Sequence, residues 1–212
     1  TSGRTSNEAA FLYQLFIRAY GTNNLPDCSN MCHEPSGVAM NEQIGSGKGS
    51  VTLDDFERAD AIFVFGQNPG TNHPRMLGEL RRAAKRGCRI VVFNPLRERG
   101  LERFTDPQSP TEMLGGGSTA IASHYFQPKI GGDLAVATGL AKVVVERADG
   151  GEATLDSTFI ATYTHGFEHY ADALRATPWD AIERESGLSR AQIEQAARVY
   201  LESRATIVCW GM

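Results

Sequence analysis

The sequence lacks the features that mark membrane-spanning and nucleic-acid-binding proteins. None of its apolar runs approaches the roughly 18 residues needed to cross a bilayer. Lys and Arg form no cluster and the net charge is −4, which argues against nucleic acid as a partner because phosphate binding needs grouped positive charge. No charged segment followed by an apolar run opens the chain, so no signal peptide is expected and the predicted location is the cytoplasm.

Cysteine is scarce as well, with four in 212 residues. They are Cys28, Cys32, Cys88 and Cys209, and they show none of the repeated pairs that bind zinc or iron–sulfur clusters. A chain of this size and cysteine content does not need a disulfide scaffold. Reduced thiols are therefore expected.

The composition is that of a soluble globular protein, with 41% hydrophobic and 22% charged residues. The length suffices for one large domain with part of another. The chain begins with Thr1, and an apolar run over residues 207–212 closes it. Both ends look cut, so the chain is expected to be an internal fragment of a longer polypeptide.

An α/β pattern is clear in the middle of the chain. Residues 61–65 and 89–93 read as fully buried strands, and a helix is expected from Pro74 to about Arg86. Strand, helix and strand within roughly 33 residues form a βαβ unit, whose strands lie parallel with a right-handed crossover. The predicted fold is an α/β three-layer α/β/α sandwich with a mostly parallel, Rossmann-like sheet.

Further elements follow from caps and periodicity. Ser6 can cap a first helix that Gly21 ends, and Thr52 can cap a short turn of helix. Residues 96–123 look irregular, and a connection of that length is usually functional. Beyond it the sequence predicts strands over 123–127 and 205–210 and helices over 131–146, 156–161, 167–176 and 189–202.

Two loops that follow the predicted strands carry residues suited to a nucleotide. Ligands of such sheets bind beyond the carboxyl ends of the strands. In residues 66–74, glycines let the backbone approach a phosphate, and the helix at Pro74 offers free N–H groups. In residues 94–99, a polar residue directly follows the strand and arginines can grip phosphate. Neither loop matches GxGxxG or a Walker loop, so simple turns are the alternative.

A third feature is the pair Cys32-His33 on a loop between helices. A thiolate is a soft metal ligand, and a neighbouring histidine can move a proton near neutral pH. A lone loop cysteine is more often a small packed residue. A redox pair of Cys28 and Cys32 is another alternative, although its spacing is not that of thioredoxin.

Taken in order, these segments resemble the catalytic subunits of molybdopterin-dependent oxidoreductases of the formate dehydrogenase type. There a cysteine or selenocysteine is followed by His, a variable residue, Pro and Ser, as in residues 32–36 here. The long segment 97–127 resembles the YdeP-type branch, whose substrate is less settled. The remaining matching positions are residues 21–24, 27–28, 60–74, 94–95, 129–135, 159, 164, 166–168, 196–198 and 210–212.

The resemblance implies a bis-(molybdopterin guanine dinucleotide) cofactor, bis-MGD, that holds molybdenum or tungsten. It implies that Cys32 is the metal ligand and His33 the neighbouring proton carrier. The residues that would meet one dinucleotide's phosphates are Gly66, Asn68, Thr71, Asn72 and His73. The residues at its phosphate, ribose and guanine contacts are Asn94, Arg97, Gly132 and Asp133.

The resemblance also implies a division of the chain and a reaction. Residues 1–21 would end a neighbouring α/β domain, and residues 22–212 would form the dinucleotide-binding domain. The whole enzyme would oxidise or reduce a small substrate such as formate by two electrons, with an electron-transfer partner and an iron–sulfur cluster bound outside this chain. The fragment itself is expected to be inactive, and Glu34 departs from the small residue often found there.

Two other functions stay open at this stage. The chain could be a nucleotide-binding α/β module without redox chemistry, or a thiol protein that uses Cys28 and Cys32. Metal analysis separates the first from an oxidoreductase, and substitution of Cys28 separates the second.

Overall fold

The computed structural model describes residues 5–25 and 32–211. The chain falls into two compact units, one up to Val51 and one from Thr52 to Gly211. The domain boundary expected after residue 21 stays a prediction, and Cys28 lies outside the described residues.

In the described residues of the first unit, helices α1 and α3 bury none of their residues. Helix α1 (Asn7–Ala19) begins as predicted, because the Ser6 side chain accepts a hydrogen bond from the Ala9 backbone N–H at 3.3 Å. Helix α3 (Glu34–Ile44) has a proline in its first turn and ends at Gly45, whose φ of 73° favours glycine.

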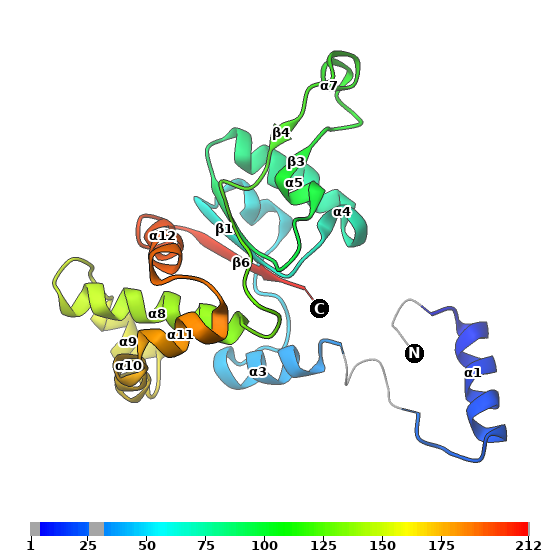
Figure 1. Cartoon of the computed structure of the whole chain (residues 1–212), viewed down its shortest axis with the longest axis horizontal. Coiled ribbons are helices and arrows are strands. Elements are labelled where there is room, and N and C mark those ends of the chain that lie inside the picture. Colours follow the sequence, from blue (N-terminus) through cyan, green and yellow to red (C-terminus); the bar gives the residue numbers. More distant parts are fainter. Residues whose placement is uncertain (1–4, 26–31, 212) are drawn as a thin grey trace. The chain divides into compact units, whose positions relative to one another are not determined.

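The second unit is built on a four-stranded sheet in which all neighbours are parallel (Figure 1). The strand order is β5-β2-β1-β6. The strands are β1 (Ala61–Phe65), β2 (Arg89–Phe93), β5 (His124–Phe126) and β6 (Thr206–Trp210). The predicted βαβ unit and the predicted α/β fold class with a mostly parallel sheet are confirmed.

One face of the sheet is covered by helix α5 (Pro74–Lys85). Side chains alternate along a strand, so Ile62 and Val64 of β1 point to this face together with Ile90 and Val92 of β2. They pack against α5 residues such as Leu80, which is fully buried. The short 3-10 helix Leu53–Glu57, capped at Thr52 as predicted, adds Phe56 to the same cluster.

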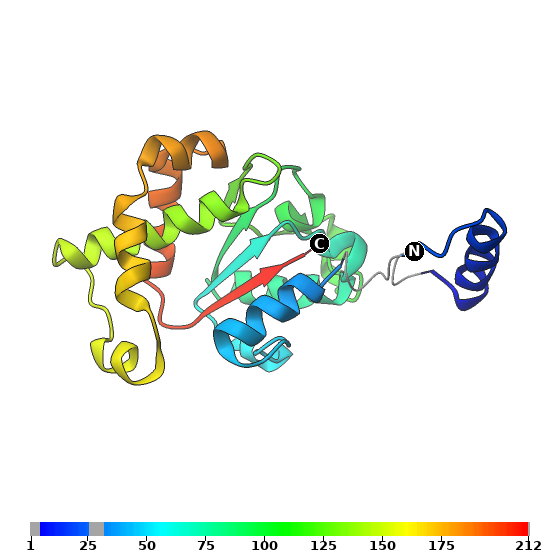
Figure 2. The ribbon, with the colours of Figure 1, turned by 90° about the horizontal axis from the view of Figure 1, so that it is seen from below.

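Helices that lie between β5 and β6 in the sequence cover part of the opposite face (Figures 1 and 2). The alternate strand residues Phe63 and Phe93 point to this side, and Phe93 stacks on Phe126 of β5. Helix, sheet and helix thus form three layers. The helices are α8 (Asp133–Asp149), α9 (Ser157–Tyr163), α10 (Phe167–Ala176), α11 (Trp179–Ser186) and α12 (Arg190–Leu201).

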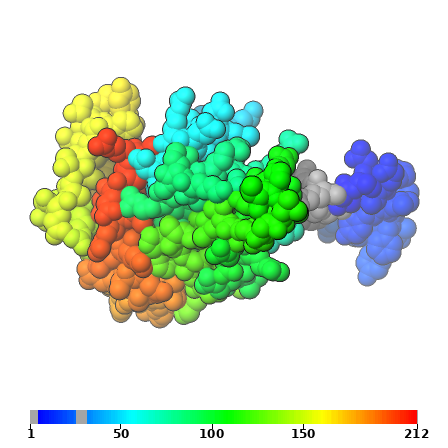
Figure 3. All heavy atoms as spheres, turned by 90° about the horizontal axis from the view of Figure 1, so that it is seen from above, coloured from blue at the N-terminus to red at the C-terminus, as the bar shows by residue number. Residues whose placement is uncertain are grey.

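The connection expected to be irregular contains short regular elements. Strands β3 (Arg103–Phe104) and β4 (Thr119–Ala120) pair antiparallel and carry helix α7 (Pro110–Gly115) between them. We call residues 103–120 the arm, which faces the viewer in Figure 3. Helix α6 (Arg99–Glu102) leads into it. A long irregular stretch was therefore the wrong expectation for about half of this segment.

Three smaller departures complete the comparison. Helix α11 has no counterpart among the sequence predictions, and helix α4 (Pro69–Asn72) occupies part of the first predicted loop. Strand β5 is one residue shorter at each end than expected. Within the described part of the chain, no helix combines the length and apolarity needed to cross a membrane.

Candidate functional site

Three of the strands end side by side at the carboxyl edge of the sheet. The last residues of β1, β2 and β5 are Phe65, Phe93 and Phe126, which are partners in the parallel register. The segments that follow these strands contain every site residue predicted in the second unit. The parallel topology thus places those residues at one edge, where ligands of such sheets bind.

The loop after β1 is a compact turn that leads into helix α4. Gly66 adopts φ of 64°, and its N–H donates to the Phe93 carbonyl oxygen at 2.8 Å. Asn68 caps α4, since its Oδ1 accepts from the Thr71 N–H at 3.2 Å. The backbone N–H groups of Asn72 and His73 are bonded within α4. Thr71, Asn72 and His73 are exposed at this edge of the sheet.

The loop after β2 is tied to the loop after β1 by two amide side chains. Asn94 is buried, and its Nδ2 donates to the Gln67 carbonyl oxygen at 3.1 Å while its Oδ1 accepts from the Leu96 N–H at 2.9 Å. In the other direction, Asn68 Nδ2 donates to Glu98 Oε2 at 2.7 Å. Both asparagines therefore hold the two loops together, and contact of either with a ligand stays a prediction.

Tyr125 of β5 organises the second loop, and sequence reasoning missed it. Its hydroxyl donates to the Leu96 carbonyl oxygen at 2.8 Å and accepts from the Glu98 N–H at 2.9 Å. Burial raises the pKa of this phenol, so it stays protonated at neutral pH. The guanidinium of Arg97 lies 4.8 Å from the ring centroid, and its Nε donates to Glu102 at 2.5 Å.

Gln67 is the second residue that sequence reasoning missed. Its Oε1 is buried without a hydrogen-bond partner among the described residues, while its Nε2 donates to the Trp210 carbonyl oxygen at 3.4 Å. A buried acceptor left unpaired costs about 1–3 kcal/mol. Such an oxygen suits a ligand that brings an N–H group, and guanine and pterin rings both carry them. The only sequence signal was its place between Gly66 and Asn68.

The segment after β5 reaches the same edge. Gln127 Nε2 donates to the Pro95 carbonyl oxygen at 2.9 Å, which joins this segment to the second loop. A Cβ on Gly132 would lie 3.0 Å from the carbonyl oxygens of Lys129 and Glu185, so close packing alone requires glycine there. Asp133 is exposed in the first turn of α8. A ligand role for either residue stays a prediction.

Cys32 and His33 belong to the first unit, and both are exposed just before α3. The His33 carbonyl oxygen accepts from the Gly37 N–H at 2.8 Å, which starts the helix. Burial raises the pKa of the Cys88 and Cys209 thiols to about 11, so both stay protonated and are poor metal ligands at neutral pH. Cys32 is thus the exposed thiol among the cysteines in the described ranges.

Comparison with known proteins points to one family. The model of the family described as "Molybdopterin oxidoreductase" matches residues 1–209. Over the whole chain, 53% of residues are identical to "Protein YdeP" of Escherichia coli K12, and 47% to the "Uncharacterized oxidoreductase Rv2900c" of Mycobacterium tuberculosis. "Formate dehydrogenase H" of Escherichia coli K12 is 30% identical. The chain spans 27–29% of the length of these relatives.

A solved structure agrees on the fold. The acetylene hydratase from Pelobacter acetylenicus superposes with a TM-score of 0.65 over 94% of this chain and 24% of that protein, at 20% sequence identity. At that identity the match concerns the fold alone.

Proposed function

The chain belongs to the molybdopterin oxidoreductase family, and from this we propose that it forms the part of such an enzyme that supplies the metal-ligating cysteine and one dinucleotide site. The observation that supports this most directly is the carboxyl edge of the sheet. There hydrogen bonds join two loops, and a buried Gln67 oxygen has no hydrogen-bond partner among the residues that the structure describes. A rigid rim with an unsatisfied acceptor is suited to a polar ring system.

The cofactor that we propose is bis-MGD with molybdenum or tungsten, which supplies two-electron redox chemistry when bound. Cys32 is its proposed protein ligand, and His33 takes up or releases a proton beside it. Gly66, Asn68, Thr71, Asn72 and His73 would face the phosphates of one dinucleotide. Asn94, Arg97, Gly132 and Asp133 would contribute to its phosphate, ribose and guanine contacts.

The proposed reaction is the two-electron oxidation or reduction of a small molecule such as formate. Similarity to formate dehydrogenase H supports the substrate class. We further propose that the full-length enzyme works in the cytoplasm, and that electrons pass to a partner protein or subunit through an iron–sulfur cluster bound by residues outside this chain.

The metal-ligand role is tested by Cys32→Ala in the full-length protein, with Cys88→Ala as the matched control. We expect Cys32→Ala to lower turnover at least about 100-fold, because the metal loses its protein ligand. Cys88 is buried and far from neutral-pH ionisation, so Cys88→Ala should keep turnover near that of the wild type. Metal and pterin content are measured alongside. Activity retained in the Cys32 variant would exclude the role.

The same samples separate the other two functions. Bound nucleotide without molybdenum, tungsten or a pterin fluorophore would indicate a binding module without redox chemistry. Equal loss of activity in Cys28→Ser and Cys32→Ser, with no metal present, would indicate a thiol pair. Molybdenum or tungsten together with a pterin supports the oxidoreductase.

The dinucleotide site is tested by Gln67→Met, which keeps the side-chain volume and removes the unpaired oxygen. The apoprotein should be equally stable or more stable, since the buried acceptor is gone. If Gln67 accepts from the cofactor, cofactor affinity should fall about tenfold, the equivalent of one hydrogen bond. Gln108→Met on an exposed position is the control. Unchanged cofactor affinity in the Gln67 variant would contradict this role.

A further inference from the structure

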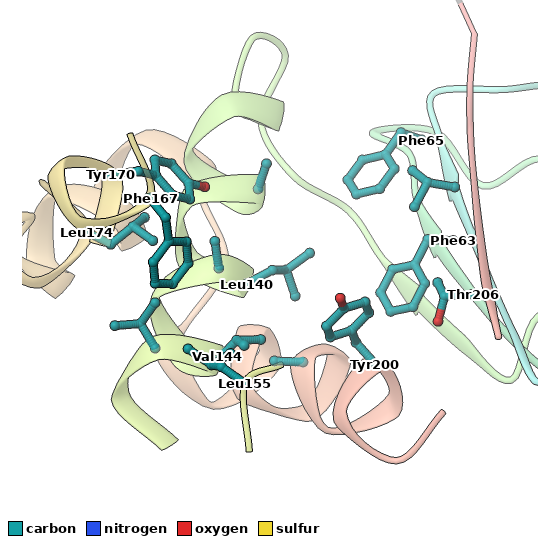
Figure 4. A pocket seen from close by; sticks show the side chains of 15 residues that line it. Phe63, Phe65, Leu140, Val144, Leu155, Phe167, Tyr170, Leu174, Tyr200 and Thr206 are labelled. Atoms are coloured by element: carbon teal, nitrogen blue, oxygen red, sulfur yellow. The ribbon is translucent and has the colours of Figure 1, made fainter. Parts of the chain in front are cut away.

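An apolar cavity of about 350 Å³ lies on the sheet face opposite α5, between the strands and the helices α8, α10 and α12 (Figure 4). Phe63 and Phe65 of β1 and Val208 of β6 form its sheet wall, and α8, α10 and α12 form the other. Large side chains remain open to solvent there: Val208 is 51% exposed and Tyr200 is 49% exposed. The cavity is thus a part of the sheet face that this chain leaves uncovered.

The uncovered face is unusual, because parallel sheets are normally covered on both sides. On the α5 side, Ile207 of β6 is buried with the core. On the cavity side, Val208 has no comparable cover. Ile207 and Val208 are neighbours in one apolar strand, yet only Ile207 is buried. The exposure of Val208 therefore reflects the absence of a covering layer on its side of β6.

The connections of the sheet predict from which side that layer comes. The steps β1 to β2 and β2 to β5 run in one direction across the sheet, and their connections lie on the α5 face. The step from β5 back to β6 runs in the opposite direction, and its helices lie on the other face. This alternation is what a single handedness of crossover requires.

We propose that in the full-length protein the cavity is filled by an amphipathic helix of the same polypeptide that follows β6. A step from β6 outward to a fifth parallel strand continues the direction of the β5-to-β6 step. With the same handedness, its crossover helix lies on the cavity side, against Phe65 and Val208. The relatives are more than three times as long as this chain, so their polypeptides have ample length for it.

The chemistry of the walls favours a helix over a small ligand. Ligand sites combine apolar walls with a few convergent polar groups that orient the ligand. Here the polar side-chain groups among the lining residues are the hydroxyls of Tyr170, Tyr200 and Thr206, and they come from three different elements. The other labelled side chains in Figure 4 are Phe63, Phe65, Leu140, Val144, Leu155, Phe167 and Leu174.

Cysteine labelling of the full-length protein tests whether the cavity is covered. Val208→Cys and Leu134→Cys are treated with a maleimide, and each site is quantified by peptide mass spectrometry in native and denatured samples. Leu134 is 79% exposed and lies outside the cavity. We expect native Cys at 208 to react at least about 100-fold more slowly than in the denatured protein, since reaction then needs local opening. A rate within about threefold of the denatured one would overturn the proposal.

A photo-cross-linking amino acid at Tyr200 identifies the cover and does not depend on the Val208 variant folding. A cross-link within one polypeptide to a segment that follows β6 supports the proposal. A cross-linked dimer would identify a second copy instead, and protection that disappears after delipidation would identify an apolar ligand. Either of these two results overturns the proposal. The absence of any cross-link, together with fast maleimide labelling of the Val208→Cys variant, overturns it as well. The same amino acid at Tyr163, outside the cavity, is the control.

Discussion

The two units of the chain differ in how they are stabilised. The unit from Thr52 to Gly211 has a sheet buried from both sides by two clusters of apolar side chains. The unit up to Val51 carries the proposed metal ligand, but its described helices α1 and α3 bury no residue. Helix α1 nevertheless has an apolar stripe that includes Phe11, Leu12, Leu15 and Phe16, all exposed.

The difference separates the scaffold from the proposed reactive group. The sheet unit has its own core beneath its loops, so the residues of the proposed dinucleotide site are positioned by contacts within that unit. The exposed apolar stripe of α1 is instead a surface suited to packing against another protein surface. The comparison predicts large effects of substitutions in the sheet unit and small ones in the first unit, as long as the 212-residue chain is studied alone.

The largest expected effect is that of Leu80→Ala on α5. Leu80 is fully buried between α5 and the sheet, so its loss should lower the free energy of unfolding by about 2–5 kcal/mol. Phe16→Ala on α1 is the counterpart. Because Phe16 is 62% exposed, this substitution should change the free energy of unfolding by less than about 0.5 kcal/mol. Urea unfolding of both variants measures the two values. Equal losses would show that α1 is buried in the isolated chain.

A smaller loss is expected from Lys142→Met on α8. The buried ammonium donates to the carbonyl oxygens of Leu174 and Arg175, at 2.9 and 3.0 Å, at the end of α10. Removing it takes this donor from the Arg175 oxygen, while the Leu174 oxygen still accepts from the Thr177 N–H at 3.3 Å, and the expected cost is about 1–3 kcal/mol. Lys129→Met is the control, because that lysine is exposed and water can replace its bond to the Arg184 carbonyl oxygen. A stability equal to the control's would contradict the capping role.

Two helix caps sharpen the comparison further. Ser189 caps α12, which is packed on the sheet, and Ser189→Ala should lower global stability by about 1 kcal/mol. Ser6 caps α1 in the same way, yet Ser6→Ala should leave the global unfolding transition unchanged and reduce only the helix content. Circular dichroism during urea unfolding records both. A shift of the midpoint in the Ser6 variant would show that α1 unfolds together with the sheet.

The smallest expected effect depends on pH and concerns the arm. The Arg81 guanidinium, with a backbone N–H and Lys85, lowers the pKa of the Glu112 carboxyl from 4.5 to about 2. A lowered pKa stabilises the folded state above pH 4.5, and this stabilisation is lost as the pH falls towards 2. Glu112→Gln should therefore lower Tm at pH 7 and match the wild type near pH 2. Glu185→Gln, at an exposed ion pair, is the control and should have the Tm of the wild type at both pH values.

Much of the sheet unit could be predicted because its signals are local. The run over β1 is wholly apolar, the run over β2 is apolar after Arg89, and a proline opens α5 between them. The arm could not be predicted in this way. Its strands have two residues each, and it is held by distant contacts such as that of Arg103 with Ser118 and of Glu112 with Arg81. Such contacts leave no periodic pattern in the sequence.

The candidate site divides in the same manner. Parallel strands were enough to predict that the loops at Gly66 and Asn94 meet at one edge. The sequence could not indicate that the side chains of Asn68 and Asn94 donate hydrogen bonds to the neighbouring loop. Nor could it indicate that Gln67 Oε1 is buried without a partner among the described residues. Those facts depend on side-chain directions that only the folded chain sets. The roles of Cys32 and His33 rest on the family resemblance.

The hydrogen bonds that Asn68 and Asn94 each donate to the neighbouring loop also limit how these two loops can move when a large ligand binds. Each tie runs from one turn to the next, so neither turn can swing outward without breaking a bond on its neighbour. The two turns are therefore expected to keep their shape when the proposed cofactor binds and leaves. Any rearrangement that its entry or release requires is expected elsewhere in the full-length protein.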